Sequence, residues 1–144
     1  MYRFEHSRAR YRHEAAQSTT AGRQAVAAAC AGRCRVTPET LLVITNLPDH
    51  DSALALARSL VERRLAACVN VLGGATSIYR WQQSVETAHE VPVFIKTRRP
   101  LYAEVEAAIR EIHSYELPEI IAVPIERGLP RYLEWVLAET SAAS

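Results

Sequence analysis

The pattern of apolar and polar residues changes at about Pro38. Beyond that point, short apolar runs typical of strands alternate with stretches in which apolar residues recur every three or four positions, as on amphipathic helices. The predicted strands cover residues 40–45, 67–72, 76–81, 85–97 and 119–125. The predicted helices cover residues 49–65, 99–112 and 129–137. The expected order is therefore βαββαβ followed by a further helix.

The first two predicted helices each carry an apolar stripe. Asp49 is the expected N-cap of the first, because its carboxylate can accept hydrogen bonds from the free N–H groups of the first turn. The stripe of this helix is predicted to be Ala53, Leu56, Ala57, Leu60, Val61 and Leu65. The stripe of the second is predicted to be Leu101, Val105, Ala108, Ile109 and Ile112. Glu106 and Arg110 are expected to form an outward i, i+4 ion pair on it.

This order of elements predicts an α+β fold, a ferredoxin-like sandwich in which two helices cover one face of an antiparallel sheet. We expect Val43, Val93 and Ile95 to make the other face apolar, and a partner subunit is its natural cover. The pair Gly73-Gly74 suggests a bulge or kink after the second strand.

Residues 76–97 form a predicted hairpin, and the rest of the domain is expected to be organised around it. Its second arm would span about 40 Å at roughly 3.3 Å per residue. A globular domain of about 100 residues is only about 33 Å across, so part of the hairpin should project. Tyr79 and Trp81 on the projecting part are expected to be interface anchors, with a binding platform as the alternative. In a second alternative, a bend at residues 86–89 or at Pro92, which lacks a ladder N–H, keeps the hairpin within one globule.

Residues 1–38 are predicted to be a disordered extension rich in Arg and Ala, and residues 39–144 a single domain. Alanines bury too little surface to offset the entropy of ordering the backbone. Alternatives for the extension are a signal-peptide core at residues 25–31 or an organelle transit peptide. Cys30 and Cys34 would share a helix face there, but without further ligands nearby they are expected to be incidental thiols.

The overall composition excludes some classes of function. Hydrophobic residues make up 49% and charged residues 23% of the chain, and the formal net charge of +1 gives no electrostatic signal for nucleic acid or membrane binding. No apolar run reaches the length of a membrane span. Three cysteines, an odd number without a dense framework, favour a reducing compartment.

Few residues stand out as candidates for chemistry, because the chain has no nucleophile motif, phosphate-binding glycine loop or Cys-x-x-Cys. Cys68 is either a small buried hydrophobe or a soft metal ligand. His113 either complements the dipole at the end of the second helix or binds a ligand. Lys96, within a strand, needs Glu90, Glu119 or an anionic ligand as its partner.

Five motifs in sequence order resemble the CutA divalent-cation tolerance family over about residues 41 to 138. They lie at residues 46–49, 65–70, 76–81, 90–97 and 113–120. The resemblance implies a cytoplasmic, ferredoxin-like homotrimer, related in architecture to the PII proteins. It also implies a role in tolerance of copper and other divalent metals, with no catalytic activity.

Some positions depart from the family pattern. Gln82 and Gln83 stand in the hairpin turn where an acidic residue and a glycine are common in the family. At the positions matching the copper ligands of relatives, this chain has Thr45, Ile112 and His113, of which only His113 can bind a metal. We therefore expect copper, or another divalent metal, to bind weakly through His113 and, if the fold brings it near, Cys68.

A second class of function uses the same fold. In the manner of PII-like trimers, clefts between subunits would bind a small anionic ligand or a protein partner through Lys96, Glu90 and Glu119, with Tyr79 and Trp81 beside them. A third class is an enzyme such as an acylphosphatase, which needs a phosphate-binding loop and an arginine beside the first strand. Residues 46–50 contain neither the loop nor the arginine.

Overall fold

The computed structural model describes residues 39–141, so the predictions for residues 1–38, including Cys30 and Cys34, lie outside this range. The described part contains β1 (Thr40–Leu47), α1 (His50–Glu62), β2 (Cys68–Val71), β3 (Ala75–Trp81), β4 (Ser84–Arg98), the 3₁₀ turn η1 (Arg99–Leu101), α2 (Tyr102–Ile112), β5 (Ile120–Pro124) and α3 (Pro130–Glu139). The predicted order is confirmed, and with it the α+β, ferredoxin-like fold.

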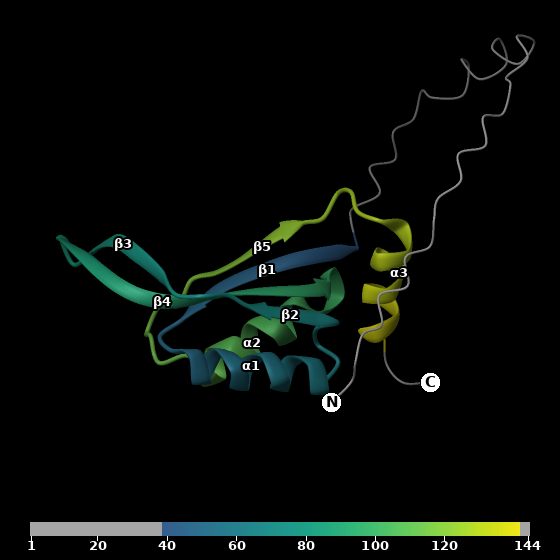
Figure 1. The fold of residues 1–144 in the computed structure, drawn as a ribbon, viewed down its shortest axis with the longest axis horizontal. Helices are drawn as coiled ribbons and strands as arrows, with labels where there is room; N and C mark the ends of the chain where they lie inside the picture. Colours follow the sequence, from purple (N-terminus) through teal and green to yellow (C-terminus); the bar gives the residue numbers. More distant parts are fainter. Residues whose placement is uncertain (1–38, 142–144) are drawn as a thin grey trace, which may run out of the picture. The chain divides into compact units, whose positions relative to one another are not determined.

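The strands form one antiparallel sheet in the order β2-β4-β1-β5, and β3 pairs with the first half of β4 (Figure 1). β1 pairs with β4 without interruption, from Thr40 opposite Arg98 to Leu47 opposite Val91. The interruption at Gly73 and Gly74 lies between β2 and β3, which both pair with β4. The glycines therefore separate two strands that share a partner.

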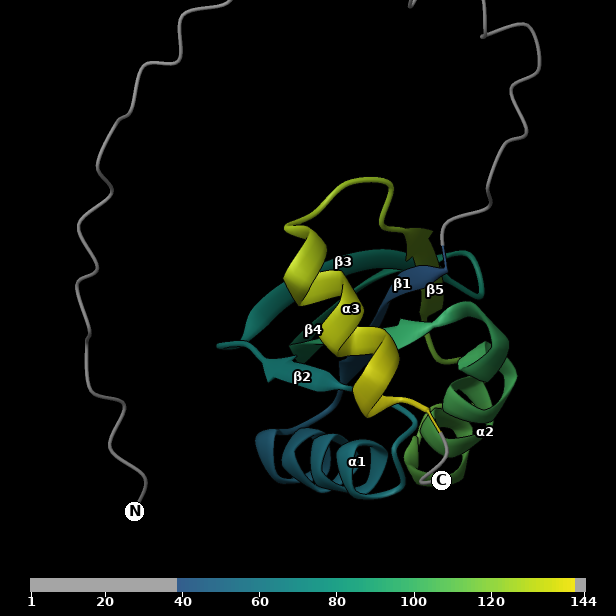
Figure 2. The ribbon, with the colours of Figure 1, turned by 90° about the vertical axis from the view of Figure 1, so that its right-hand side faces the viewer.

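One face of the sheet is covered by α1 and α2, which lie side by side along it (Figures 1 and 2). Val43, Val93 and Ile95 point into this layer and are completely buried, together with Leu56 of α1 and Ile109 of α2. The expectation that these three strand residues make the other face apolar is wrong, because side chains of a strand alternate and the odd-numbered residues of β1 and β4 face the helices.

The opposite side of the sheet is formed by the even-numbered residues of β1 and β4 and by the odd-numbered residues of β5. We call the apolar set Leu42, Ile44, Phe94, Ile121 and Val123 the open face. Ile44 lies directly opposite both Phe94 and Ile121, so the three make one row across β4, β1 and β5. Ile121 and Val123 are 46% and 47% exposed. The prediction of an apolar second face thus holds with different residues.

The helix boundaries follow their sequence signals with small corrections. Glu106 and Arg110 form the expected ion pair, at 4.0 Å. Val61 and Ile112, which are expected in the buried stripes, are instead 43% and 38% exposed, and both lie in the last turns of their helices. α3 packs against β4 and β1 at the end of the sheet that is far from the hairpin (Figure 1).

Asp49 caps α1 as predicted. Its two carboxylate oxygens accept hydrogen bonds from the backbone N–H and the hydroxyl of Ser52, both at 2.8 Å. These bonds, the backbone one most of all, hold the pKa of Asp49 below its ordinary value. A lowered pKa stabilises the fold above the unfolded-state pKa of about 3.9, and this contribution is lost as the pH falls through the folded-state pKa.

Asp49→Ala is therefore expected to lower the midpoint of thermal unfolding at neutral pH, with a difference that shrinks below about pH 4. Scanning calorimetry at neutral and acid pH measures both effects. Asp51→Ala removes a carboxylate from the same turn without removing the cap, so an equal loss in the two variants would contradict this role.

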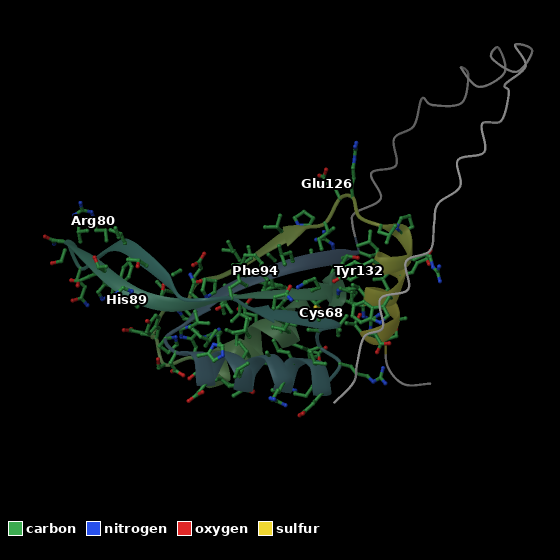
Figure 3. The ribbon with its side chains drawn as sticks, viewed as in Figure 1. Cys68, Arg80, His89, Phe94, Glu126 and Tyr132 are labelled. Atoms are coloured by element: carbon green, nitrogen blue, oxygen red, sulfur yellow. The ribbon has the colours of Figure 1, made fainter. Side chains whose placement is uncertain are left out.

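The hairpin of β3 and β4 projects beyond the helices, and Arg80 marks its tip (Figures 1 and 3). β4 has 15 residues, of which the first half pairs with β3 and the second with β1 and β2. Pairing with β3 is one-to-one from Ala75 opposite Glu90 to Trp81 opposite Ser84. The alternative in which a bend at residues 86–89 keeps the hairpin within the globule is therefore wrong.

Pro92 lies in the interior strand β4 without disturbing its register with β1. Its carbonyl accepts a hydrogen bond from the Leu72 N–H at 3.0 Å, on the side where β2 has just ended. The N and C=O of one strand residue point to the same side of an antiparallel strand. The missing N–H of Pro92 therefore costs the β1–β4 ladder nothing, and it falls on the side where the pairing is interrupted between Val71 opposite Val93 and Ala75 opposite Glu90.

Gln82 and Gln83 form the two-residue turn of the hairpin, with φ angles of 42° and 73°. Positive φ at both central positions is the type I′ arrangement, which favours Asn-Gly because a side chain with a Cβ is strained there. This turn joins β3 and β4 with the twist that the strands require, at a cost in backbone strain.

Gln83→Gly is expected to raise the free energy of unfolding by about 1 kcal/mol, since glycine adopts positive φ without a Cβ clash. Urea unfolding at fixed protein concentration measures the change. Thr87→Gly, in the neighbouring strand, is the control and should lose stability; a loss of equal size for Gln83→Gly would show that the turn is not strained.

Candidate functional site

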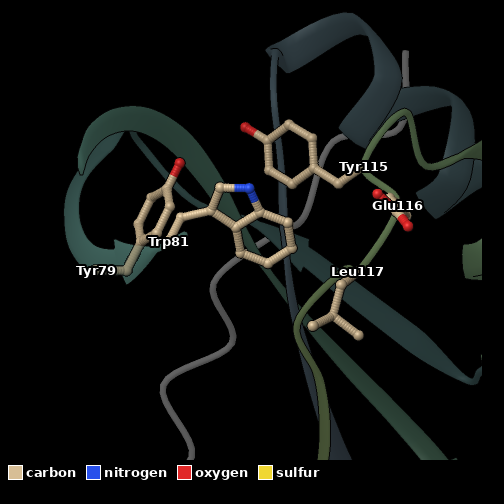
Figure 4. A pocket seen from close by; sticks show the side chains of 5 residues that line it. All are labelled: Tyr79, Trp81, Tyr115, Glu116 and Leu117. Atoms are coloured by element: carbon tan, nitrogen blue, oxygen red, sulfur yellow. The ribbon is translucent and has the colours of Figure 1, made fainter. Parts of the chain in front are cut away.

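Two adjoining hollows lie where the hairpin leaves the sheet. The first has a volume of about 310 Å³ and is lined by Tyr79, Trp81, Tyr115, Glu116 and Leu117 (Figure 4). The second, of about 390 Å³, shares Tyr79, Tyr115 and Leu117 and adds Ser77, Ile78, Glu90 and Glu119. We call the two together the aromatic hollow. Each is at the lower end of the size range of pockets that bind small molecules.

One wall of the hollow comes from the hairpin. Every second residue of a strand lies on the same face, so one face of β3 carries Ala75, Ser77, Tyr79 and Trp81. Glu90 lies on this face too, because it is directly opposite Ala75 in the pairing of β3 with β4. Tyr79 and Trp81 are 42% and 40% exposed, so their rings are accessible.

The other wall is the loop of residues 113–119, between α2 and β5. Asn46, near the end of β1, holds both ends of this loop. Its carbonyl is 2.7 Å from Nε2 of His113, and its amide N–H donates to the Glu119 carboxylate at 2.6 Å. The backbone N–H of Tyr115 donates to Nδ1 of His113 at 3.1 Å. Nδ1 is thus the acceptor of a neutral imidazole, and Nε2 carries the proton and donates it to Asn46.

Glu90 is the most buried charged group of the hollow, with 7% of its surface exposed. The phenol of Tyr115 lies beside its carboxylate. Burial, and after it the charge of Glu90, raises the pKa of Tyr115, which keeps that phenol protonated as a donor. The ion pairs among the described residues, Arg63–Glu111 and Arg110–Glu106, do not involve the carboxylates of the hollow, which are Glu90, Glu116 and Glu119. The hollow therefore combines aromatic rings with negative charge.

Lys96 lies apart from the other four residues of the predicted ligand cleft. Its ammonium donates to the side-chain carbonyl of Asn70 and, at 3.4 Å, to the Phe94 carbonyl. Lys96 lies six positions after Glu90 on β4, which is roughly 20 Å of strand. The structure thus brings Tyr79, Trp81, Glu90 and Glu119 together without their predicted cation.

The two predicted metal ligands, Cys68 and His113, are also separated. Cys68 pairs with Lys96 of β4. His113 is hydrogen-bonded to Asn46, which pairs with Pro92 of the same strand. Lys96 and Pro92 are about 13 Å apart along β4, so the two predicted ligands lie at different places on the sheet. Cys68 instead lies beside Tyr132 of α3, whose pKa is raised by burial and then by the thiol (Figure 3).

The geometry does not fit a resident divalent metal. Both ring nitrogens of His113 are in hydrogen bonds, and among residues 39–141 no group of three or more His, Cys, Asp or Glu side chains could hold a metal ion. Tight binding of a divalent ion needs such a set of converging ligands.

Asn46, Tyr115, Glu116 and Leu117 are site residues that reasoning from the sequence missed. All four stand in motifs that carry the family resemblance, at residues 46–49 and 113–120. Two polar, proline-containing motifs far apart in the sequence could have indicated a joint site, but only the β1–β5 pairing of the fold brings them together.

Residues 41–139 match the family model described as CutA1 divalent ion tolerance protein. The chain belongs to this family. The Divalent-cation tolerance protein CutA of Thermus thermophilus is 39% identical over 99 residues, which are 69% of this chain and 96% of the relative. Protein CutA of Mus musculus is 43% identical over 97 residues, and the match covers 67% of this chain but only 55% of the mouse protein.

Solved CutA structures have the same fold. The crystal structure of CutA from Xylella fastidiosa superimposes with a TM-score of 0.70 at 42% identity and covers 72% of this chain and 99% of its own. Relatives differ in the compartment that their names state, since an Arabidopsis thaliana protein is called chloroplastic and one from Archaeoglobus fulgidus periplasmic. No helix among the described residues has the length and apolar character to cross a membrane.

Proposed function

We propose that this chain acts in the tolerance of divalent cations such as copper, as a non-catalytic, cytoplasmic homotrimer of PII-like architecture. Relatives named divalent-cation tolerance proteins support the role in tolerance. The single observation that supports the assembly is the open face beside the projecting hairpin.

Both features are costly for a single chain. An apolar face with Ile121 and Val123 nearly half exposed favours association, and the unpaired edges of a projecting hairpin can pair with another chain. In the proposed trimer, each open face packs against its neighbours, and each hairpin reaches across to an adjacent subunit. A closed ring covers every such face and leaves no free end for further growth.

The tolerance role, in this proposal, does not rest on a tightly held ion. His113 can bind a metal only by giving up its hydrogen bond to Asn46 or to Tyr115. Copper binding is therefore weak, and the tolerance of divalent cations depends on the assembled trimer and not on storage of the ion.

Titration of the purified chain with copper(II) chloride in a calorimeter is expected to give a dissociation constant weaker than about 10 µM, since a single imidazole makes a poor site. His113→Ala should abolish the remaining heat, and so should acid pH, because a protonated imidazole cannot bind a metal. His50→Ala, on the surface of α1, is the control. Tight, stoichiometric binding that survives His113→Ala would mean that the ligands lie elsewhere.

The alternative of an anionic ligand in the same cleft has no observation in its favour. The hollow has three carboxylates on its walls, and Lys96 is bonded to Asn70 at the other end of the strand.

The proposed role is tested by growth. A bacterial host that lacks its own family member is challenged with rising concentrations of copper, with and without the full-length chain. Expression is expected to restore growth, and Ile44→Asp, which disrupts the open face, should not restore it. Equal growth with and without the parent chain would overturn the role in tolerance, and rescue by a monomeric Ile44→Asp variant would overturn the need for a trimer.

A further inference from the structure

We propose that the aromatic hollow is a binding site for an organic ammonium ion. The proposal goes beyond divalent-cation tolerance and does not depend on the copper affinity of the chain.

The rings supply the first part of the argument. Figure 4 shows the indole of Trp81 between the rings of Tyr79 and Tyr115, with Leu117 completing the wall. Aromatic faces attract cations through their quadrupole, with tryptophan the strongest, and a cage of several such rings suits an alkylated ammonium group whose surface is apolar while its charge is positive. A neutral apolar ligand would use the rings but not the charges beside them.

The carboxylates supply the second part. Glu90 is more than nine-tenths buried and lines the hollow, and its partner there, the Tyr115 phenol, is uncharged. A buried carboxylate without a cation is costly. Glu116 and Glu119 add charge of the same sign on the loop side, so the field in the hollow favours a cation and opposes an anion.

The size of the hollow and its donors distinguish an organic cation from a metal ion. About 310 Å³ is far more than one ion occupies, and rings make up much of the wall. Hard divalent ions require several converging oxygen ligands, whereas among the described residues no such group of three exists. An ammonium group needs only a ring face and one or two carboxylates.

The ammonium group could belong to a free small molecule or to a lysine side chain of a polypeptide. Choline represents the first source and Nα-acetyl-lysine amide the second. The matched neutral probe is the alcohol in which carbon replaces the nitrogen of choline, which keeps the shape and removes the charge.

The experiment uses the full-length chain carrying Trp135→Phe, so that Trp81 is its only tryptophan. At constant ionic strength, one of the two ammonium probes should change the Trp81 fluorescence saturably, with a dissociation constant of about 1 mM or tighter, and calorimetry should give the same value. The neutral alcohol should bind at least about tenfold more weakly. The probe that binds identifies the source of the ammonium group.

Glu90→Gln, which keeps the shape of the side chain, should weaken binding about tenfold. Glu116→Gln, on an exposed loop residue, gives a second variant in case the first does not fold, and it should weaken binding about threefold. Glu104→Gln on α2 is the matched control and should bind like the parent. The proposal is overturned if neither ammonium probe saturates, if the neutral alcohol binds equally well, or if both hollow variants bind like Glu104→Gln.

Discussion

Ile44→Asp is expected to convert the proposed trimer into single chains at micromolar concentration. Ile44 is the middle residue of the row that Phe94 and Ile121 complete across the open face. A carboxylate there would be buried without a partner when two faces meet, which costs several kcal/mol. In the single chain the same side chain is only partly buried, so the variant should still fold. Analytical ultracentrifugation of parent and variant measures the change in mass.

Leu54→Asp is the matched control. Leu54 is a 38% exposed apolar residue on the outer side of α1, away from the sheet. The Leu54→Asp substitution adds the same charge to the same domain, and it should leave the mass measured by ultracentrifugation unchanged. Dissociation by both variants would indicate a general loss of stability, and dissociation by neither would show that the open face is not the interface.

Leu56→Ala is expected to lower the free energy of unfolding by about 3 kcal/mol, because removing a buried leucine loses its burial and leaves a cavity. Leu56 is completely buried between α1 and the sheet, in the cluster that includes Val43 and Ile95. Urea unfolding of parent and variant at the same chain concentration measures the difference, since the stability of an oligomer depends on concentration.

Leu54→Ala, two residues earlier on the same helix, is the control for this substitution. Its side chain is partly exposed, and its loss should cost less than about 1 kcal/mol. Equal losses at the two positions would contradict the assignment of the helix-covered face as the core.

Much of the fold could be predicted because local signals and the final structure agree. Asp49 was predicted to start α1, and it caps the helix through Ser52. The hairpin was predicted to project, and β4 extends well past the helices to meet β3. In each case the short-range pattern is also what the tertiary structure needs.

The side of the sheet on which each residue lies was harder to predict. Val43 and Ile44 are equally apolar neighbours in a run without alternation, so the sequence does not indicate which of them faces the helices. The register between β1 and β4 decides which of the two faces the helices, because a shift of one residue would exchange the two faces of the strand.

The site was predicted only in part, for a related reason. Tyr79 and Trp81 are conspicuous on the hairpin, and Glu90 and Glu119 are acidic residues beside apolar strand residues. The role of Asn46 was not visible, because it depends on hydrogen bonds to His113 and Glu119, which are 67 and 73 residues away. Lys96 was expected as the cation of the cleft, but the strand places it beside Asn70 instead.

The mass of the full-length chain in solution tests the central claim most directly. Size-exclusion chromatography with light scattering, at micromolar concentration and physiological salt, should give three times the chain mass of 16.1 kDa. A mass of one chain would contradict the account, since the open face and the hairpin would then stay exposed in the working protein.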